Sequence, residues 1–313
     1  LDKTTYANGE SVTLTATSSP GQEPFHAWMG DILTRSNPVT LVMTNNKTVI
    51  ARFTSIVFTW TNVQGGDWDV ARNWRPNLAP GSNDIVIIPS STVTLNTPAN
   101  CADVTLNAGT LNGNGTLTVW ENFAWMGGSM GGSGRTLLET NATLEINAAF
   151  ASLNSRTLEN AGTIQFGGSG ALNVTGGATV TNRPGGLIHV QNAATIGSVV
   201  ANGRLDNAGT FRKSSSTGTA TFGSGMSFNN SGTVEIQTGT LNLAGGGTNS
   251  GTFTTPATTV VEWTGGTFML NPGGQLNGDG LYRINAGTVA ANTNVAIEKL
   301  DMISGTLGGT GVV

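Results

Sequence analysis

Apolar residues recur at every second position along much of the chain, in short segments separated by Gly, Asn and Pro. Residues 12–16 (Val-Thr-Leu-Thr-Ala) alternate in this way, and residues 85–88 (Ile-Val-Ile-Ile) are apolar throughout. No window keeps the i, i+3, i+4, i+7 spacing of an amphipathic helix. Because successive side chains of a strand point to opposite faces, the pattern predicts an all-β fold of short strands.

A four-residue motif, Asn-x-Gly-Thr, repeats along the chain. It begins at Asn107, Asn160, Asn207, Asn230, Asn249 and Asn285. The intervals fit multiples of roughly 18 to 24 residues, near the length of one coil of a parallel β-solenoid. We therefore predict a right-handed parallel β-solenoid of about eleven coils over residues 90–313. Residues 305–313 repeat the coil pattern without a polar cap, so we expect the solenoid to continue beyond residue 313.

The residues that follow the motif orient one strand of each coil. Directly after it stand Leu111, Ile164, Phe211, Val234, Phe253 and Val289, all apolar. The two-residue period predicts that these side chains form inward rows, while the largely polar residues after them face outward. Gly in the motif permits positive φ at a corner, and the six Asn side chains are predicted to stack into a structural ladder along the axis.

Residues 1–54 form a different zone, with short strands joined by Pro-Gly and Asn-Pro turns. Its pattern is carried by Tyr6, Gly9, Pro20, Gly21, Phe25, Trp28, Gly30, Asp31, Leu41, Met43 and Phe53. In this order these residues resemble a divergent InlB B-repeat, a small β-module of bacterial surface proteins. The resemblance implies an extracellular or cell-surface location, a spacer or adhesive role, and no catalysis.

A Trp-rich segment, residues 55–89, lies between these zones and is predicted to be a linker and cap. Trp60, Trp68 and Trp74 stand where a solenoid must begin, and an uncovered first coil would expose apolar core and strand edges. With its Gly66-Asp-Trp68, Asn73-Trp74 and Asp84-Ile-Val-Ile-Ile-Pro89 motifs, the chain after the first zone resembles the passenger-like β-solenoids of large bacterial surface and autotransporter-type proteins.

The composition of the chain limits the classes of partner that it can bind. Charged residues make up 10% of the chain, and 14 basic against 18 acidic residues give no positive field for a phosphate backbone, so we expect no nucleic-acid partner. One cysteine excludes an internal disulfide and Cys-based metal clusters, and we expect neither a cofactor nor a metal. No apolar run approaches the ~20 residues of a membrane helix, so no membrane insertion is expected.

The acidic residues argue against catalysis. No Asp stands between Asp103 and Asp206, where a lyase or hydrolase would need clustered carboxylates. The acids in that stretch are Glu121, Glu139, Glu145 and Glu159. The spacing of Glu139 and Glu159 would allow stacking on adjacent coils, but solvated surface glutamates are the favoured interpretation. We predict a protein that is not an enzyme.

The histidines, the single cysteine and the Gly-rich segment are each explained better by a structural role than by a catalytic one. His26 and His189 fall in separate zones, which argues against a His pair or triad and favours surface histidines. Cys101 has no companion motif and is predicted to be a small buried hydrophobe. The Gly-rich residues 127–134 lack a Gly-Lys-Ser/Thr ending, so a wide solenoid turn is predicted instead of a phosphate loop.

One aromatic cluster remains as a candidate ligand site. Trp120, Glu121, Phe123 and Trp125 lie within six residues, directly after an alternating strand. Exposed rings beside a carboxylate commonly bind sugars, which makes this cluster a candidate carbohydrate platform. Packing of the rings into the core is the other interpretation, and it is favoured.

Together these features predict a non-enzymatic extracellular segment of a bacterial surface protein, acting as a stalk, adhesin or fibre component. Such a segment would associate end to end into filaments, or bind other cell-surface and matrix components or glycans. The alternative is a secreted β-helix protein that binds carbohydrate or degrades polysaccharide.

Overall fold

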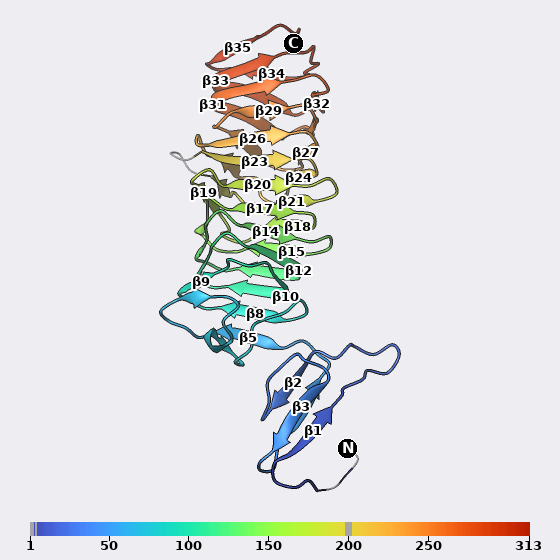
Figure 1. Ribbon diagram of the computed structural model, residues 1–313. Helices are drawn as coiled ribbons and strands as arrows, with labels where there is room; N and C mark the ends of the chain where they lie inside the picture. Colours follow the sequence, from blue (N-terminus) through green and yellow to red (C-terminus); the bar gives the residue numbers. More distant parts are fainter. Residues whose placement is uncertain (1–2, 4, 198–201) are drawn as a thin grey trace.

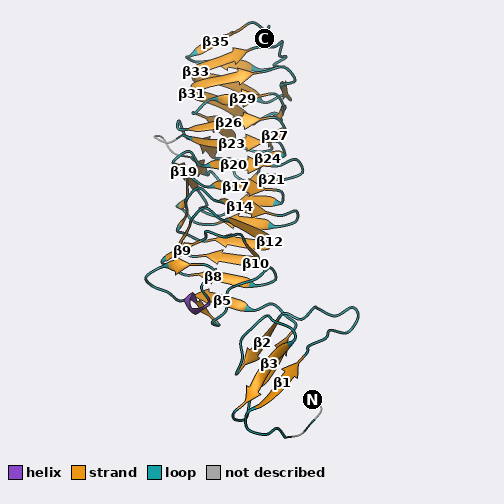
Figure 2. Ribbon diagram, in the orientation of Figure 1, coloured by secondary structure: helices purple, strands orange, loops and turns teal. Residues whose placement is uncertain are grey.

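The computed structural model describes residues 3, 5–197 and 202–313, and its structure is almost entirely β. Figure 1 shows a small N-terminal module at one end of a tall stack of coils. Figure 2 shows one short helix in the described part, the 3-10 turn η1 (Ala71–Asn73). Nowhere in these residues does a helix reach the length and hydropathy that a membrane crossing requires. The all-β prediction is confirmed.

The N-terminal module consists of two antiparallel strand pairs. These are β1 (Glu10–Leu14) with β3 (Val39–Met43), and β2 (Ala27–Gly30) with β4 (Val49–Arg52). Val12 and Leu41 are paired in register and buried. Trp28 is also buried, with its ring centroid 5.2 Å from that of Phe25. The module therefore has a small core of its own, in which these two rings are the largest groups.

From β5 onward, the strands form one parallel solenoid of about eleven turns, with three faces that follow one another in each turn. Face A contains β5 (Val57–Trp60), β8 (Ile85–Ile88), the second halves of β10 (Ala99–Leu106) and β12 (Thr116–Trp125), β15 (Thr143–Ile146), β18 (Thr163–Phe166), β21 (Leu187–Val190), β24 (Thr210–Lys213), β27 (Thr233–Ile236), β30 (Thr252–Thr254) and β32 (Gln275–Asn277). Face B contains β6 (Gly66–Asp67), β9 (Thr92–Thr94), β11 (Thr110–Asn112), β13 (Ser129–Met130), β16 (Ala151–Asn154), β19 (Leu172–Thr175), β22 (Thr195–Ile196), β25 (Thr219–Phe222), β28 (Thr240–Leu243), the first halves of β31 (Val260–Leu270) and β33 (Leu281–Ala291), and β34 (Leu300–Met302). Face C contains the first halves of β10 and β12, β14 (Arg135–Leu138), β17 (Thr157–Asn160), β20 (Thr179–Asn182), β23 (Gly203–Asn207), β26 (Met226–Asn230), β29 (Gly247–Asn249), the second halves of β31 and β33, and β35 (Thr306–Gly309).

The core of the solenoid consists of rows of inward side chains that run along its axis. Each turn contributes one side chain to each row. In β18, Ile164 and Phe166 are buried while Thr163 and Gln165 are partly exposed. This alternation recurs in strand after strand, because each turn buries its apolar side chains against the turns above and below.

The six apolar residues that follow the motif are all buried, at 1% exposure or less. Their predicted inward direction is confirmed. They do not form one row, however. Ile164, Phe211, Val234 and Phe253 stack on face A, whereas Leu111 lies on face B and Val289 on face C. The motif occurs at three different corners, so motif spacing alone does not identify the face.

The Trp-rich segment, expected as a linker and cap, forms the first turn of the solenoid itself. β5 pairs in parallel with β8 and antiparallel with β7 (Trp74–Arg75). Trp60, Trp68 and Trp74 are buried, and the rings of Trp60 and Trp68 each lie 4.9 Å from that of Trp74. The three rings fill the end of the core, as capping requires.

Candidate functional site

Five asparagine side chains line the corner between faces C and A inside the solenoid. They are Asn160, Asn182, Asn207, Asn230 and Asn249, each at most 2% exposed. From Asn160 to Asn230, each Nδ2 donates to the Oδ1 of the next amide, at 2.8, 2.7, 2.7 and 2.8 Å. An amide can continue such a series because it carries both a donor and an acceptor. The ladder satisfies buried polar groups by repetition along the axis.

The ladder ends where its column becomes apolar. Leu138 precedes Asn160 in register, and Leu270 follows Asn249. With a leucine beyond it, the Nδ2 atom of Asn249 is buried without a hydrogen-bond partner. One unsatisfied donor is thus the cost of ending the series in the core.

Two of the six predicted ladder residues lie elsewhere, and one ladder residue was missed. Asn107 is exposed at the corner from face A to face B, and Asn285 lies at the corner from face B to face C, where its Nδ2 donates to Glu262. Asn182 belongs to the ladder although Arg-Pro-Gly-Gly follows it in place of x-Gly-Thr. Which asparagines occupy the same position in successive turns is decided by the register of the strands. The motif identifies those positions only in part.

The candidate carbohydrate platform does not form as three exposed rings. Phe123 and Trp125 are 1% and 0% exposed, because the alternation of β12 turns both into the core. Trp120 and Glu121 lie at the corner that precedes this half-strand, where Trp120 is 48% exposed. Only these two of the four candidate residues are accessible.

The acidic residues do not form a pair for acid and base chemistry. Glu159 lies opposite Leu137, so Glu139 and Glu159 are not in register. Two arginines bind the carboxylate of Glu159, with Arg135 at 2.9 Å and Arg183 at 2.5 Å. The described residues contain no cluster of three or more His, Cys, Asp or Glu able to hold a metal ion.

His189 and Cys101 have ordinary surroundings for a solenoid. The Nε2 atom of His189 lies 2.7 Å from the hydroxyl of Ser214, and the pKa of His189 is lowered by partial burial and by the nearby Arg212. Cys101 is fully buried, in the column that becomes the asparagine ladder. Burial raises the pKa of the Cys101 thiol, which makes it a poor nucleophile.

One arginine is buried at the corner between faces B and C. The Gly-rich residues 127–134, predicted to be one wide turn, instead contain β13 and the corners beside it. Arg156 is fully buried, and its guanidinium donates to the hydroxyl of Thr136 and to backbone carbonyls that include those of Gly113, Gly115 and Gly131. Burial lowers the pKa of Arg156 to about 10, so the group stays charged at neutral pH. The carbonyls of two earlier turns thereby accept hydrogen bonds from the charged guanidinium, and Arg156 connects three turns.

A second buried charge joins the module to the solenoid. Asp84, at 0% exposure, directly precedes β8. One carboxylate oxygen lies 2.5 Å from Nε2 of His26 and accepts from the backbone N–H of Ile56 at 3.2 Å. The other accepts from Nη2 of Arg35 at 2.5 Å and from the N–H of Gly81 at 2.6 Å. His26 and Arg35 belong to the module, so Asp84 fixes both parts to each other.

This contact corrects the interpretation of His26 as a surface histidine. Its side chain is 10% exposed, and Ala27 beside it joins the hydrophobic cluster of the solenoid with Ile56. The guanidinium of Arg35 also lies 5.7 Å from the centre of the Phe58 ring. The sequence held one local sign of this site, the Pro80-Gly81 turn closed by Asp84, but nothing in it placed His26 and Arg35 opposite that turn.

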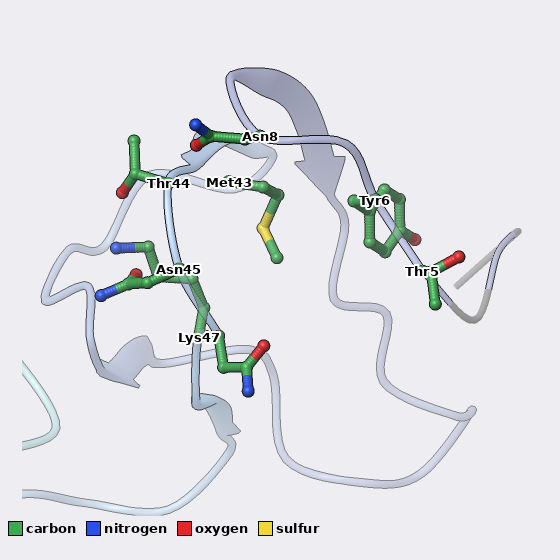
Figure 3. Close-up of a pocket in the computed structure, with 8 residues that line it drawn as sticks. Thr5, Tyr6, Asn8, Met43, Thr44, Asn45 and Lys47 are labelled. Atoms are coloured by element: carbon green, nitrogen blue, oxygen red, sulfur yellow. The ribbon is translucent and has the colours of Figure 1, made fainter.

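Surface clefts occur on the module and at its junction with the solenoid. Figure 3 shows a cleft of about 440 Å³ in the module, with Thr5 and Tyr6 on one side and Met43, Asn45 and Lys47 on the other. A second cleft, of about 380 Å³, lies at the junction, and residues of both parts line it, among them His26 and Glu121. Of the two accessible residues of the predicted carbohydrate site, Glu121 therefore lines the junction cleft.

Comparison with known proteins identifies the module only. Residues 2–57 match the family model described as the divergent InlB B-repeat domain, a domain of bacterial surface proteins. No curated protein and no solved structure matches the chain. The resemblance of the solenoid to autotransporter-type passenger regions stays a prediction.

Proposed function

We propose that this chain is a non-catalytic segment of a bacterial surface protein, in which the solenoid is a stiff spacer that carries the N-terminal module at a fixed orientation. The observation that carries the proposal is the continuous strand ladder from β5 to β35, joined at its first turn to the module through Asp84. With strands ~4.8 Å apart, about eleven turns extend roughly 50 Å.

The polar interior supports a mechanical role. The asparagine ladder and the Arg156 bonds connect successive turns, so that stretching or bending the rod breaks buried hydrogen bonds as well as strand pairing. The match of the module to a domain of surface proteins supports an extracellular location. Stalk, adhesin and fibre roles all use such a rod, and end-to-end filaments stay a prediction that light scattering tests.

The absence of catalysis is part of the proposal. Glu159 is held between two arginines, and Glu121 is an exposed residue on the wall of the junction cleft. Incubation with pectins, alginates, glucans and xylans should release no reducing ends and no unsaturated products. Product that disappears on Glu121→Gln, Glu139→Gln or Glu159→Gln would overturn this part.

Small-angle X-ray scattering tests the spacer. We expect one rigid elongated particle whose distance distribution fits the structure with the module fixed. A distribution that requires a range of orientations between module and solenoid would contradict the fixed orientation. A collapsed particle would contradict the rod.

A further inference from the structure

The junction cleft has walls that are fixed before any ligand arrives. Its lining combines Glu23, His26 and Phe53 of the module, Ser55 of the connecting segment, and Asn83 and Glu121 of the solenoid. Asp84 holds the two parts together directly behind it. Clefts between structural units, with convergent polar groups, are common binding sites.

His26 forms part of the wall of this cleft, and its ring is held in place by Asp84. Asp84 can only accept, so Nε2 of His26 carries the hydrogen in their 2.5 Å contact. Nη1 of Arg35, 3.2 Å from the same Nε2, is then a donor facing a donor and makes no bond there.

The charge of the cleft selects a ligand that donates hydrogen bonds. Glu23 and Glu121 are exposed carboxylates on its wall. The described lining of the cleft contains no Lys or Arg, and the Asp84 carboxylate already engages the guanidinium of Arg35. The cleft therefore offers acceptors and negative charge, which disfavours uronic acids, sulfated sugars and other anions.

A second cleft of about 340 Å³ continues this surface and shares Glu23, Phe53 and Thr54 with the first. Its other lining residues are Thr17, Ser18, Ser19 and Gln22, which carry hydroxyl and amide groups and no charge. Phe53 is partly exposed and lies on both clefts. A long ligand would thus meet carboxylates at one end, neutral hydrogen-bonding groups at the other, and an aromatic ring between.

We propose that the two clefts form one binding site for a glycan chain of neutral or amino sugars. Sugar hydroxyls donate to the carboxylates of Glu23 and Glu121, and the C–H face of one ring packs on Phe53. A cationic peptide would pair with the carboxylates but not with the hydroxyl and amide groups of Thr17, Ser18, Ser19 and Gln22 that make up the rest of the second cleft, which favours the sugar. The proposal adds a ligand to the spacer and does not depend on the stiffness of the solenoid.

Calorimetric titration of the full chain tests the site. The probes are hexasaccharides of glucose, of N-acetylglucosamine and of glucosamine, with an oligogalacturonate as the anionic comparison and oligolysine as the cationic peptide. We expect at least one of the first three to bind and the oligogalacturonate not to bind. The double variant Glu23→Ala with Glu121→Ala should weaken that binding by about tenfold or more. Glu145→Ala, an exposed glutamate on β15, is the matched control and should leave the affinity unchanged.

Three results would overturn the proposal. These are no binding of any of the three sugars at millimolar concentration, binding that the double variant leaves unchanged, and oligolysine binding with the same residue dependence in place of the sugars. Because both glutamates are exposed, the double variant should keep the circular dichroism and thermal midpoint of the parent chain.

Discussion

The solenoid interior and the module junction both bury polar groups, but they satisfy them in opposite ways. In the solenoid, neutral amides repeat once per turn from Asn160 to Asn249, and each serves the next. At the junction, the single charge of Asp84 receives hydrogen bonds from the module and from the solenoid. The ladder distributes its buried polar groups over five turns, whereas the junction depends on the carboxylate of one residue.

This difference has a mechanical consequence. Loss of one amide divides the ladder but leaves its other links in place, because each turn depends mainly on its neighbours. Loss of Asp84 leaves donors from both parts without an acceptor at once, and removing one partner of a buried charged group costs more than the net worth of the contact. The junction should therefore be the weakest single point of the assembly to mutation.

The largest effect is expected for Asp84→Ala. The substitution leaves the guanidinium of Arg35 and the ring of His26 partly buried without their carboxylate, and we expect about 3–5 kcal/mol of destabilisation at the junction. Urea denaturation followed by tryptophan fluorescence measures it, since Trp28 lies on β2 of the module and Trp60, Trp68 and Trp74 lie in the first turn of the solenoid. Asp69→Ala, an exposed aspartate of the same segment, is the control. Equal midpoints for the two variants would mean that Asp84 does not hold the junction.

A smaller effect is expected for Asn207→Leu, which interrupts the ladder in its middle. The Nδ2 of Asn182 loses its acceptor and the Oδ1 of Asn230 loses its donor, so we expect about 2–3 kcal/mol of destabilisation. Thermal unfolding measures this, with the exposed Asn173→Leu of β19 as control. A variant as stable as the parent would show that the buried amides do not depend on one another.

A still smaller effect is expected for Asn249→Leu, at the end of the ladder. It removes the Nδ2 that has no partner and places a leucine against Leu270, while Asn230 becomes the new terminal amide. The backbone N–H of Gly251 also loses the Oδ1 of Asn249 as its acceptor, so we expect a cost of about 1–2 kcal/mol, below that of Asn207→Leu. A cost equal to that of Asn207→Leu would contradict the view that position along the ladder decides the effect.

The same contrast explains what the sequence could predict. Repetition made the solenoid visible, since the motif recurs often enough to give coil length, inward residues and four of the five ladder positions. The face of each strand was not predictable from the motif, because the copies of the motif at Asn107 and Asn285 lie at other corners. Asn182 carries no motif, so only strand register reveals it.

The junction was beyond sequence reasoning for a related physical reason. His26 and Arg35 are separated from Asp84 by 58 and 49 residues, and they meet it once, with no period to announce the contact. The predicted carbohydrate site was likewise predictable only in part. Strand alternation buried Phe123 and Trp125, whereas the exposure of Glu121 beside the module depends on how two units pack.

Cysteine labelling should show which region opens first. Cys101 lies on β10, and the second half of that strand pairs with β8, which directly follows Asp84. The column of Cys101 continues through Val119 and Leu138 to Asn160. Burial raises the pKa of the Cys101 thiol. Because the thiolate is the reactive form, a raised pKa means that alkylation at pH 8 to 9 should be very slow in the native chain. Labelling then requires local opening of the first turns. We expect Asp84→Ala to accelerate labelling by iodoacetamide, measured by mass spectrometry, while Asn207→Leu leaves the rate close to that of the parent. Equal acceleration in both variants would mean that the solenoid opens as one unit, and the distinction between a distributed interior and a single-point junction would be wrong.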